Sequence, residues 1–122
     1  MDDRRKWVRL NKGLAFSFRQ VNGFLRSGGR TKNISPGGLC FPLGSYFPVG
    51  TLLEIEIHFE DFKIPVKALT RVIWVIQHNN RDLPFEVGVE FLEIPPNQRD
   101  MLHAYIKRYP SEGDSSPVQW DD

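Results

Sequence analysis

Four cationic side chains gather near the start of the chain: Arg4, Arg5, Lys6 and Arg9 fall within six positions, around Trp7. An arginine guanidinium is planar and always charged, and it pairs with phosphate or carboxylate groups through two parallel hydrogen bonds. Such a cluster has three possible roles: a solvated tail, an arm that contacts nucleic acid, or half of a binding site for a smaller anion. The charge distribution along the chain and a second polar segment help to distinguish these three roles.

The net charge of +1 conceals an uneven distribution. Residues 1–32 contain nine Lys or Arg and two Asp, a balance of +7, whereas residues 33–122 contain seven Lys or Arg and thirteen acids, a balance of −6. A protein that coats DNA without sequence preference needs a broad basic surface. We therefore expect the anion-facing surface in the first quarter of the chain, and a small anion or local phosphate cluster as its partner rather than DNA or RNA.

A second polar segment, NISPGG, follows this basic region. Asn33 offers an acceptor and two donors, and Ser35 offers a hydroxyl. We expect Pro36, Gly37 and Gly38 to form a tight turn in which glycine permits positive φ and close approach to the backbone. Asn and Ser in a turn also commonly bond their own backbone, so the segment alone is compatible with a purely structural role.

The residues that could serve catalysis or metal binding form no recognisable pattern. His58, His78 and His103 are scattered, and none has a Cys, a carboxylate or a second His at metal-ligand spacing. The sequence also lacks a nucleophile elbow, a phosphate-binding P-loop and an HExxH motif. We predict that the protein is not an enzyme and holds no metal or cofactor.

Composition indicates one folded domain in a reducing compartment. The chain has 122 residues, of which 40% are hydrophobic, and a single cysteine, Cys40. No apolar run approaches the roughly 20 residues that span a bilayer. The charged start MDDRRKW leads into no apolar segment of the kind found in signal peptides. We expect a cytoplasmic protein without membrane insertion.

Most of the chain has the pattern of β-strands. Residues 53–59 and 85–91 alternate apolar and polar side chains with a period of two, as do residues 14–18. Residues 63–77 are too long for one flat strand, and their apolar face changes near Ala68–Leu69, which predicts a bulge or bend. A hairpin turn is expected around residues 78–82, where Asn79 and Asn80 tolerate positive φ. Two further segments are a short strand at GLCFPL, limited by Pro42, and a flexible, basic hairpin at GFLRSGGRTK.

A helix is expected at the end of the domain, because IPPNQRDMLHAYIKRY opens with proline and then places apolar side chains along one stripe. The predicted fold is all-β with one helix: a six-stranded antiparallel β-barrel followed by a C-terminal α-helix. We divide the chain into a flexible N-terminal arm (residues 1–12), the barrel and helix (residues 13–109) and a disordered acidic tail (residues 110–122). The tail contains Trp120, whose role the sequence leaves open.

The two polar segments gain meaning from their order. Arg5-x-x-x-Arg9, then about two dozen residues, then Asn33-x-Ser35-x-x-Gly38 resembles the bipartite signature of the PilZ domain family. The resemblance covers roughly residues 4–108 and includes GTLLEIEI, TRVIWV and GVEF. It implies a six-stranded antiparallel barrel with a C-terminal helix. It also implies a bacterial receptor for the second messenger cyclic di-GMP.

Site residues follow from the same resemblance. Arg5 and Arg9 would clamp guanine and phosphate from the N-terminal arm, since arginine matches guanine O6 and N7 or a phosphate in a bidentate manner. The turn containing Asn33, Ser35, Gly37 and Gly38 would form the fixed wall on the barrel. Cyclic di-GMP carries two phosphates and two guanines, which suits cations beside planar donors and acceptors.

Two further residues are implied with open roles. In the family, an arginine directly before the first motif accompanies binding of two intercalated ligands, and Arg4 occupies that position. Trp74 would stack on an outer guanine, although a core position is an equal alternative because Trp74 shares the parity of Val72 and Ile76. Trp7 is expected to pin the arm to the barrel.

Two other functions remain as alternatives. One is a protein-interaction adaptor with a PilZ-like barrel that binds no nucleotide, and the other is a small barrel that binds single-stranded nucleic acid. The second requires exposed aromatic side chains beside a basic groove, whereas the outward strand positions here are acidic. Both as a cyclic di-GMP receptor and as an adaptor, the chain would act through a downstream protein partner that the sequence does not identify.

Overall fold

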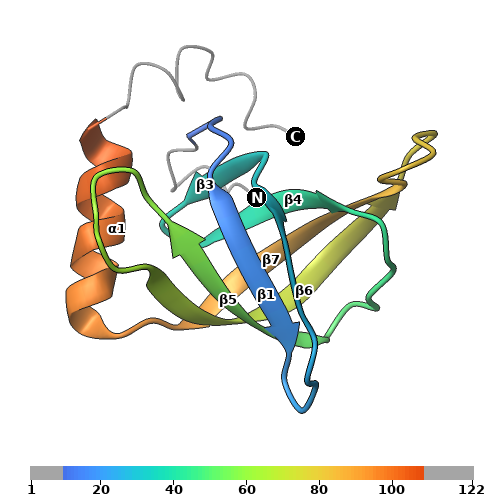
Figure 1. The fold of residues 1–122 in the computed structure, drawn as a ribbon, viewed down its shortest axis with the longest axis horizontal. Helices are drawn as coiled ribbons and strands as arrows, with labels where there is room; N and C mark the ends of the chain where they lie inside the picture. Colours follow the sequence, from blue (N-terminus) through green and yellow to red (C-terminus); the bar gives the residue numbers. More distant parts are fainter. Residues whose placement is uncertain (1–9, 109–122) are drawn as a thin grey trace, which may run out of the picture.

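A curved antiparallel sheet and one helix make up the domain (Figure 1). The structure, a computed structural model, describes residues 10–108. Residues 1–9 of the predicted arm and the predicted tail lie outside this range. The elements in chain order are β1 (Ala15–Gln20), β2 (Arg26–Arg30), β3 (Asn33–Ser35), β4 (Gly38–Leu43), β5 (Leu52–His58), β6 (Val66–Gln77), β7 (Phe85–Glu93) and α1 (Pro96–Arg108).

The seven strands are ordered β2-β1-β5-β6-β7-β4-β3, and every neighbouring pair is antiparallel. The predicted all-β fold with a C-terminal helix is confirmed, but the strand count of six is wrong. Arg26–Arg30, expected in a flexible hairpin, pairs with β1 along its whole length. All five residues of β2 are exposed, so the strand has no apolar alternation that a sequence pattern could reveal. The sheet is a half-barrel with β2 and β3 at its edges, rather than a closed barrel.

The core fills the inside of this half-barrel, as the alternating patterns predict. Leu53, Ile55, Ile57 and Phe59 are all buried, while the glutamates between them lie on the outer face. Aromatic rings link β1 to β4 across the core, with the Phe16 and Phe41 ring centroids 4.6 Å apart. Burial of such side chains is the main stabilising contribution to a small domain.

Strand β6 is irregular at two places. Its register against β7 shifts between Leu69 and Thr70, at the predicted bend, but the extra residue there is Leu92 of β7 and the buried face of β6 does not change, so the predicted change of face near Ala68–Leu69 is wrong. The face changes instead at the second shift, between Val72 and Trp74, where the extra residue is Ile73 of β6. A bulge of this kind inserts a residue and reverses which side chains face inward. Val72 is therefore buried, whereas Ile76, four residues later, is 48% exposed. The outer face of β6 gains Trp74 through this second shift.

The β6–β7 hairpin forms without the positive φ expected at Asn79 and Asn80. Among the described residues, the non-glycine residue with positive φ is Asn22, in the β1–β2 turn, at 75°. Asn80 instead accepts hydrogen bonds through its side-chain oxygen from the backbone N–H groups of Asp82 and Leu83, at 3.0 and 3.1 Å. A side-chain acceptor in a turn achieves the reversal with ordinary backbone angles.

Helix α1 lies across one end of the half-barrel (Figure 1). It buries Leu102, Tyr105 and Ile106, and the Tyr105 ring lies 4.5 Å from the ring of Phe59. Its last residue, Arg108, pairs with Asp61. Within residues 10–108, no helix has the length and apolar character needed to cross a membrane.

Candidate ligand-binding face

Leu10, the residue that follows the first predicted motif, pairs with the second motif. Arg4, Arg5 and Arg9 lie outside the described residues, but Leu10 forms an antiparallel bridge with Ile34, the residue between Asn33 and Ser35. The Leu10 N–H donates to the Ile34 carbonyl at 2.8 Å, and the Ile34 N–H donates to the Leu10 carbonyl at 3.0 Å. Both apolar side chains are fully buried. The chain therefore enters the sheet directly beside the second motif.

The β3–β4 turn is organised by Ser35. Its hydroxyl accepts a hydrogen bond from the Gly37 N–H at 3.2 Å and donates to the Gly38 carbonyl at 3.4 Å. The Gly37 carbonyl in turn accepts from the N–H of Phe91 on β7, at 2.9 Å. The structural role that the sequence permitted for Ser35 is thus present, and it fixes the turn against the neighbouring strand.

Gly38 serves close strand packing rather than an unusual backbone angle. The positive φ predicted for this turn is wrong. Among the described residues, the glycine with a positive φ is Gly50, at 98°. A Cβ atom at position 38 would lie 2.0 Å from the carbonyl oxygen of Val89 and 3.1 Å from the Cα of Glu90. Only glycine lets β4 approach β7 this closely, and the backbone of Gly37 and Gly38 is half-buried.

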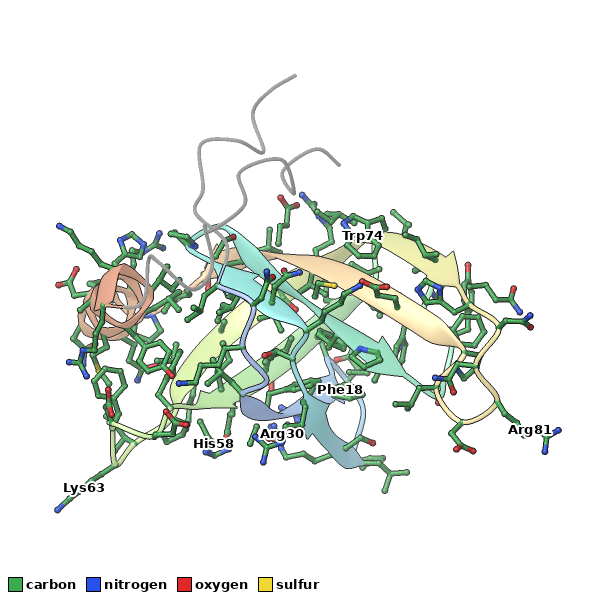
Figure 2. The ribbon with its side chains drawn as sticks, turned by 90° about the horizontal axis from the view of Figure 1, so that it is seen from above. Phe18, Arg30, His58, Lys63, Trp74 and Arg81 are labelled. Atoms are coloured by element: carbon green, nitrogen blue, oxygen red, sulfur yellow. The ribbon has the colours of Figure 1, made fainter. Side chains whose placement is uncertain are left out.

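Trp74 lies in the same row of the sheet as Asn33. The strand register aligns Trp74 with Gly88, Gly88 with Cys40, and Cys40 with Asn33. The indole covers Gly88 so closely that a Cβ there would lie 2.1 Å from Trp74 Cε2. Trp74 is half-buried and lies outside the hydrophobic core, on the outer face of the sheet (Figure 2). Of the two roles proposed for Trp74, the core position is therefore wrong, because the bulge in β6 breaks the parity with Val72.

A charged cluster that sequence reasoning missed lies beside this row. The Glu86 carboxylate accepts hydrogen bonds from Lys32 Nζ at 3.0 Å and Cys40 Sγ at 3.0 Å, and lies 2.7 Å from His78 Nε2. Burial disfavours its charged form, but the hydrogen bonds from Cys40, His78 and Lys32 outweigh this and lower the pKa of Glu86 to about 2. The outward parity of Glu86 was visible in the sequence, but its partners come from three other segments.

A second ion pair flanks the turn. The register aligns Arg71 with Glu90, Glu90 with Gly38, and Gly38 with Ser35. The Arg71 Nε donates to Glu90 Oε2 at 2.9 Å. The outer face of β6, β7, β4 and β3 thus presents an indole, an amide, a hydroxyl and bare glycine backbone between two charged groups. Such a face can contact a flat ligand with polar edges.

The described part of the chain contains no candidate metal centre. Among residues 10–108, no three His, Cys, Asp or Glu side chains gather closely enough to hold a metal ion.

Comparison with known families settles which family the fold and the two motifs represent. A model of the PilZ domain matches residues 3–108 of the chain, a range that includes both motifs. The chain belongs to the PilZ family. PilZ domains are non-enzymatic receptors for cyclic di-GMP, so the prediction that the protein is not an enzyme is confirmed at the level of the family.

Solved PilZ structures share the fold of this PilZ domain. The PilZ domain of YcgR from Escherichia coli, solved with cyclic di-GMP, matches with a TM-score of 0.65 at 14% identity, over 93% of this chain and 99% of that chain. MotI/DgrA, an inhibitor of motility from Bacillus subtilis, matches with a TM-score of 0.71 at 22% identity, over 87% of this chain. The chain spans half the length of the Bacillus protein. No curated protein sequence matches significantly.

Proposed function

We propose that this PilZ protein is a receptor for cyclic di-GMP, which binds between the first-motif arginines and the outer face of the β3–β4 hairpin. The Leu10–Ile34 bridge is the observation that carries the proposal. Arg9 precedes Leu10 by one peptide bond, and consecutive Cα atoms are about 3.8 Å apart. The bridge therefore starts the arginine segment beside Asn33 and Ser35, as a shared site requires.

Each part of the site has a partner on the ligand. Arg5 and Arg9 supply bidentate donors to guanine O6 and N7 or to a phosphate. Asn33 and Ser35 supply acceptors and donors for a guanine edge or ribose. The Ser35–Gly38 bond of 3.4 Å is long, so the hydroxyl can turn its hydrogen toward a ligand without losing the bond from Gly37. The backbone at Gly37 and Gly38 admits close approach of the ligand.

Trp74 completes the face by stacking. Its indole already lies directly against Gly88, in line with Asn33 across β7 and β4, and remains partly exposed. A guanine held at Asn33 can therefore extend toward the indole along one row of the sheet. Stacking of a base on an aromatic side chain contributes about 1–3 kcal/mol.

The proposal includes two ligand molecules per chain and a conformational change in the part of the arm that precedes the Leu10 bridge. Two intercalated ligands bring four phosphates, which offset the mutual repulsion of Arg4, Arg5, Lys6 and Arg9. Folding this segment across the sheet then creates a surface made of ligand, arm and barrel. We propose that a downstream protein partner in the cytoplasm recognises that surface.

Calorimetry with three ligands tests the proposal. We expect cyclic di-GMP to bind with a dissociation constant near 1 µM, roughly −8 kcal/mol, and GTP or a short single-stranded oligonucleotide to bind far more weakly. An absence of heat with all three ligands at millimolar concentration would support the adaptor that binds no nucleotide. Preference for the oligonucleotide would support a nucleic-acid-binding barrel instead.

A further inference from the structure

The β1–β2 turn exposes two large apolar side chains next to each other. Phe24 is 96% exposed and Leu25 is 86% exposed, the highest values among the exposed large hydrophobic residues of the described chain. The turn projects beyond the body of the sheet at the bottom of Figure 1. We call this pair the hairpin knob. Adjacent exposed side chains of this kind mark an interaction site rather than ordinary surface.

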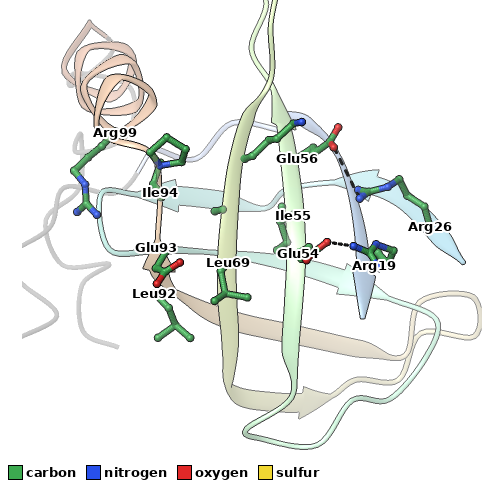
Figure 3. A pocket seen from close by; sticks show the side chains of 13 residues that line it. Arg19, Arg26, Glu54, Ile55, Glu56, Leu69, Leu92, Glu93, Ile94 and Arg99 are labelled. Atoms are coloured by element: carbon green, nitrogen blue, oxygen red, sulfur yellow. Dashed lines mark hydrogen bonds and ion pairs between the residues drawn. The ribbon is translucent and has the colours of Figure 1, made fainter. Parts of the chain in front are cut away.

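A hollow of about 750 Å³ lies beside the knob, on the outer side of β1, β5, β6 and the end of β7. Its apolar lining includes Ala68, Leu69 and Leu92, and Leu92 is 37% exposed (Figure 3). We call this the outer hollow. It lies apart from the proposed ligand face, which occupies the outer side of β3, β4 and the bulged half of β6. Its volume accommodates two large apolar side chains.

The walls of the outer hollow carry both signs of charge. Arg19 pairs with Glu54, and Arg26 Nη2 lies 3.9 Å from Glu56 Oε2, so arginines of the hairpin face glutamates of β5. The remaining charged lining residues are Lys67, Arg99 and Glu93. Four cations and three carboxylates nearly balance. An anionic membrane or a nucleic acid would favour a hollow lined by cations alone. A lining with nearly equal numbers of cations and carboxylates instead suits a protein surface that also carries both signs of charge.

We propose that the occupant of the outer hollow is the hairpin knob of a second copy of this chain, in a two-fold symmetric dimer. Arg26 directly follows the knob and also lines the hollow, so both features lie on one side of the molecule. A two-fold rotation then places each knob in the hollow of the other copy, and both contacts form together. This inference does not depend on nucleotide binding.

Sedimentation equilibrium of the full chain without nucleotide tests the dimer. We expect a monomer–dimer equilibrium between micromolar and millimolar chain concentrations. Phe24→Asp and Leu92→Asp, which alter the knob and the hollow, should each weaken association at least about tenfold. Ile64→Asp changes a residue that is 53% exposed in the β5–β6 connection and should leave association unchanged. Circular dichroism of each variant confirms that the fold is intact.

Mixing the two variants distinguishes knob-in-hollow contact from other dimers. A heterodimer of Phe24→Asp and Leu92→Asp chains retains one intact knob in one intact hollow, so an equimolar mixture should associate more strongly than either variant alone. If two knobs met each other directly, the mixture would recover nothing. A monomer at every concentration overturns the proposal, as does a dimer unaffected by Phe24→Asp. Monomeric protein that floats with vesicles of anionic phospholipid, and loses this property in Phe24→Asp, would assign the knob to a membrane and overturn it too.

Discussion

At the scale of single residues, Gly38 illustrates how a motif residue can be required by the fold itself. An added Cβ would meet the Val89 carbonyl oxygen at 2.0 Å, a backbone atom that cannot turn aside. We predict that Gly38→Ala destabilises the protein by about 2–3 kcal/mol, because β4 and β7 must separate. Gly13→Ala is a matched control, since its nearest contact would be an ordinary 3.6 Å. Urea unfolding of both variants measures the difference, and equal stability would contradict this role.

Glu86 is the second residue with a measurable consequence. Its pKa lies near 2 in the folded protein against an ordinary value of 4.5, so its charged form stabilises the fold above about pH 4.5. This stability is lost as the pH falls from about 4.5 toward 2, where the carboxylate facing Lys32, His78 and Cys40 becomes protonated. We predict that Glu86→Gln is less stable than the wild type at pH 7, by on the order of 2 kcal/mol.

The same difference should shrink to a small fraction near pH 2, because about half of the wild-type carboxyl groups are then neutral. Comparison with the variant isolates Glu86 from the other carboxylates, which titrate in both proteins. Urea unfolding followed across this pH range gives the curve. A constant difference at all pH values would mean that the charge of Glu86 contributes nothing to stability.

At the scale of elements, regular alternation was predictable and local irregularity was not. The strand pattern of residues 53–59 identified both β5 and its buried face, because one side of an antiparallel strand faces the core. Strand β2 has no buried residue and is held by backbone pairing with β1, which leaves no trace in side-chain pattern. The bulge between Val72 and Trp74 moved the indole to the outer face, and simple parity could not locate it.

The candidate site was predictable only in part, for a related reason. Both motifs were visible in the sequence, and so was the role of Ser35 in its turn. The Glu86 cluster joins residues 32, 40, 78 and 86, which only the strand order brings together. Likewise, the need for glycine at position 38 arises from β7, more than fifty residues along the chain. Long-range packing of this kind has no local pattern.

The Leu10 bridge makes a prediction at the same scale. Leu10 and Leu102 are both fully buried, so replacing either by Ala should cost about 2–5 kcal/mol of stability. Leu10 also anchors the segment that follows the first motif, whereas Leu102 lies on α1. Leu10→Ala should therefore weaken cyclic di-GMP binding at least about tenfold more than Leu102→Ala. Equal affinities in calorimetry, at a temperature where both variants are folded, would show that the bridge does not position the arginines.

At the scale of the whole molecule, the uneven charge distribution determines the expected stoichiometry. Lys12, Arg19, Arg26 and Lys32 already pair with carboxylates. The four cations around the first motif, Arg4, Arg5, Lys6 and Arg9, match the four phosphates of two ligands rather than the two phosphates of one. We predict two ligands per chain in calorimetry, and one ligand per chain in Arg4→Leu. The fold should be unchanged in this variant, because Arg4 precedes the sheet. One ligand per chain in both proteins would remove the role given to Arg4.

Binding of cyclic di-GMP at the outer face is tested by a nuclear magnetic resonance titration of the labelled chain with this ligand. We predict that the largest shifts occur at the Leu10, Ser35 and Gly38 amides and at the indole N–H of Trp74, while the amides of α1 remain unchanged. In Arg5→Ala or Arg9→Ala, the same resonances should shift only at ligand concentrations about 10- to 150-fold higher, as the loss of charge-assisted hydrogen bonds implies. Resonances that stay in place at millimolar ligand, or that shift only at a distant face, would contradict the central claim.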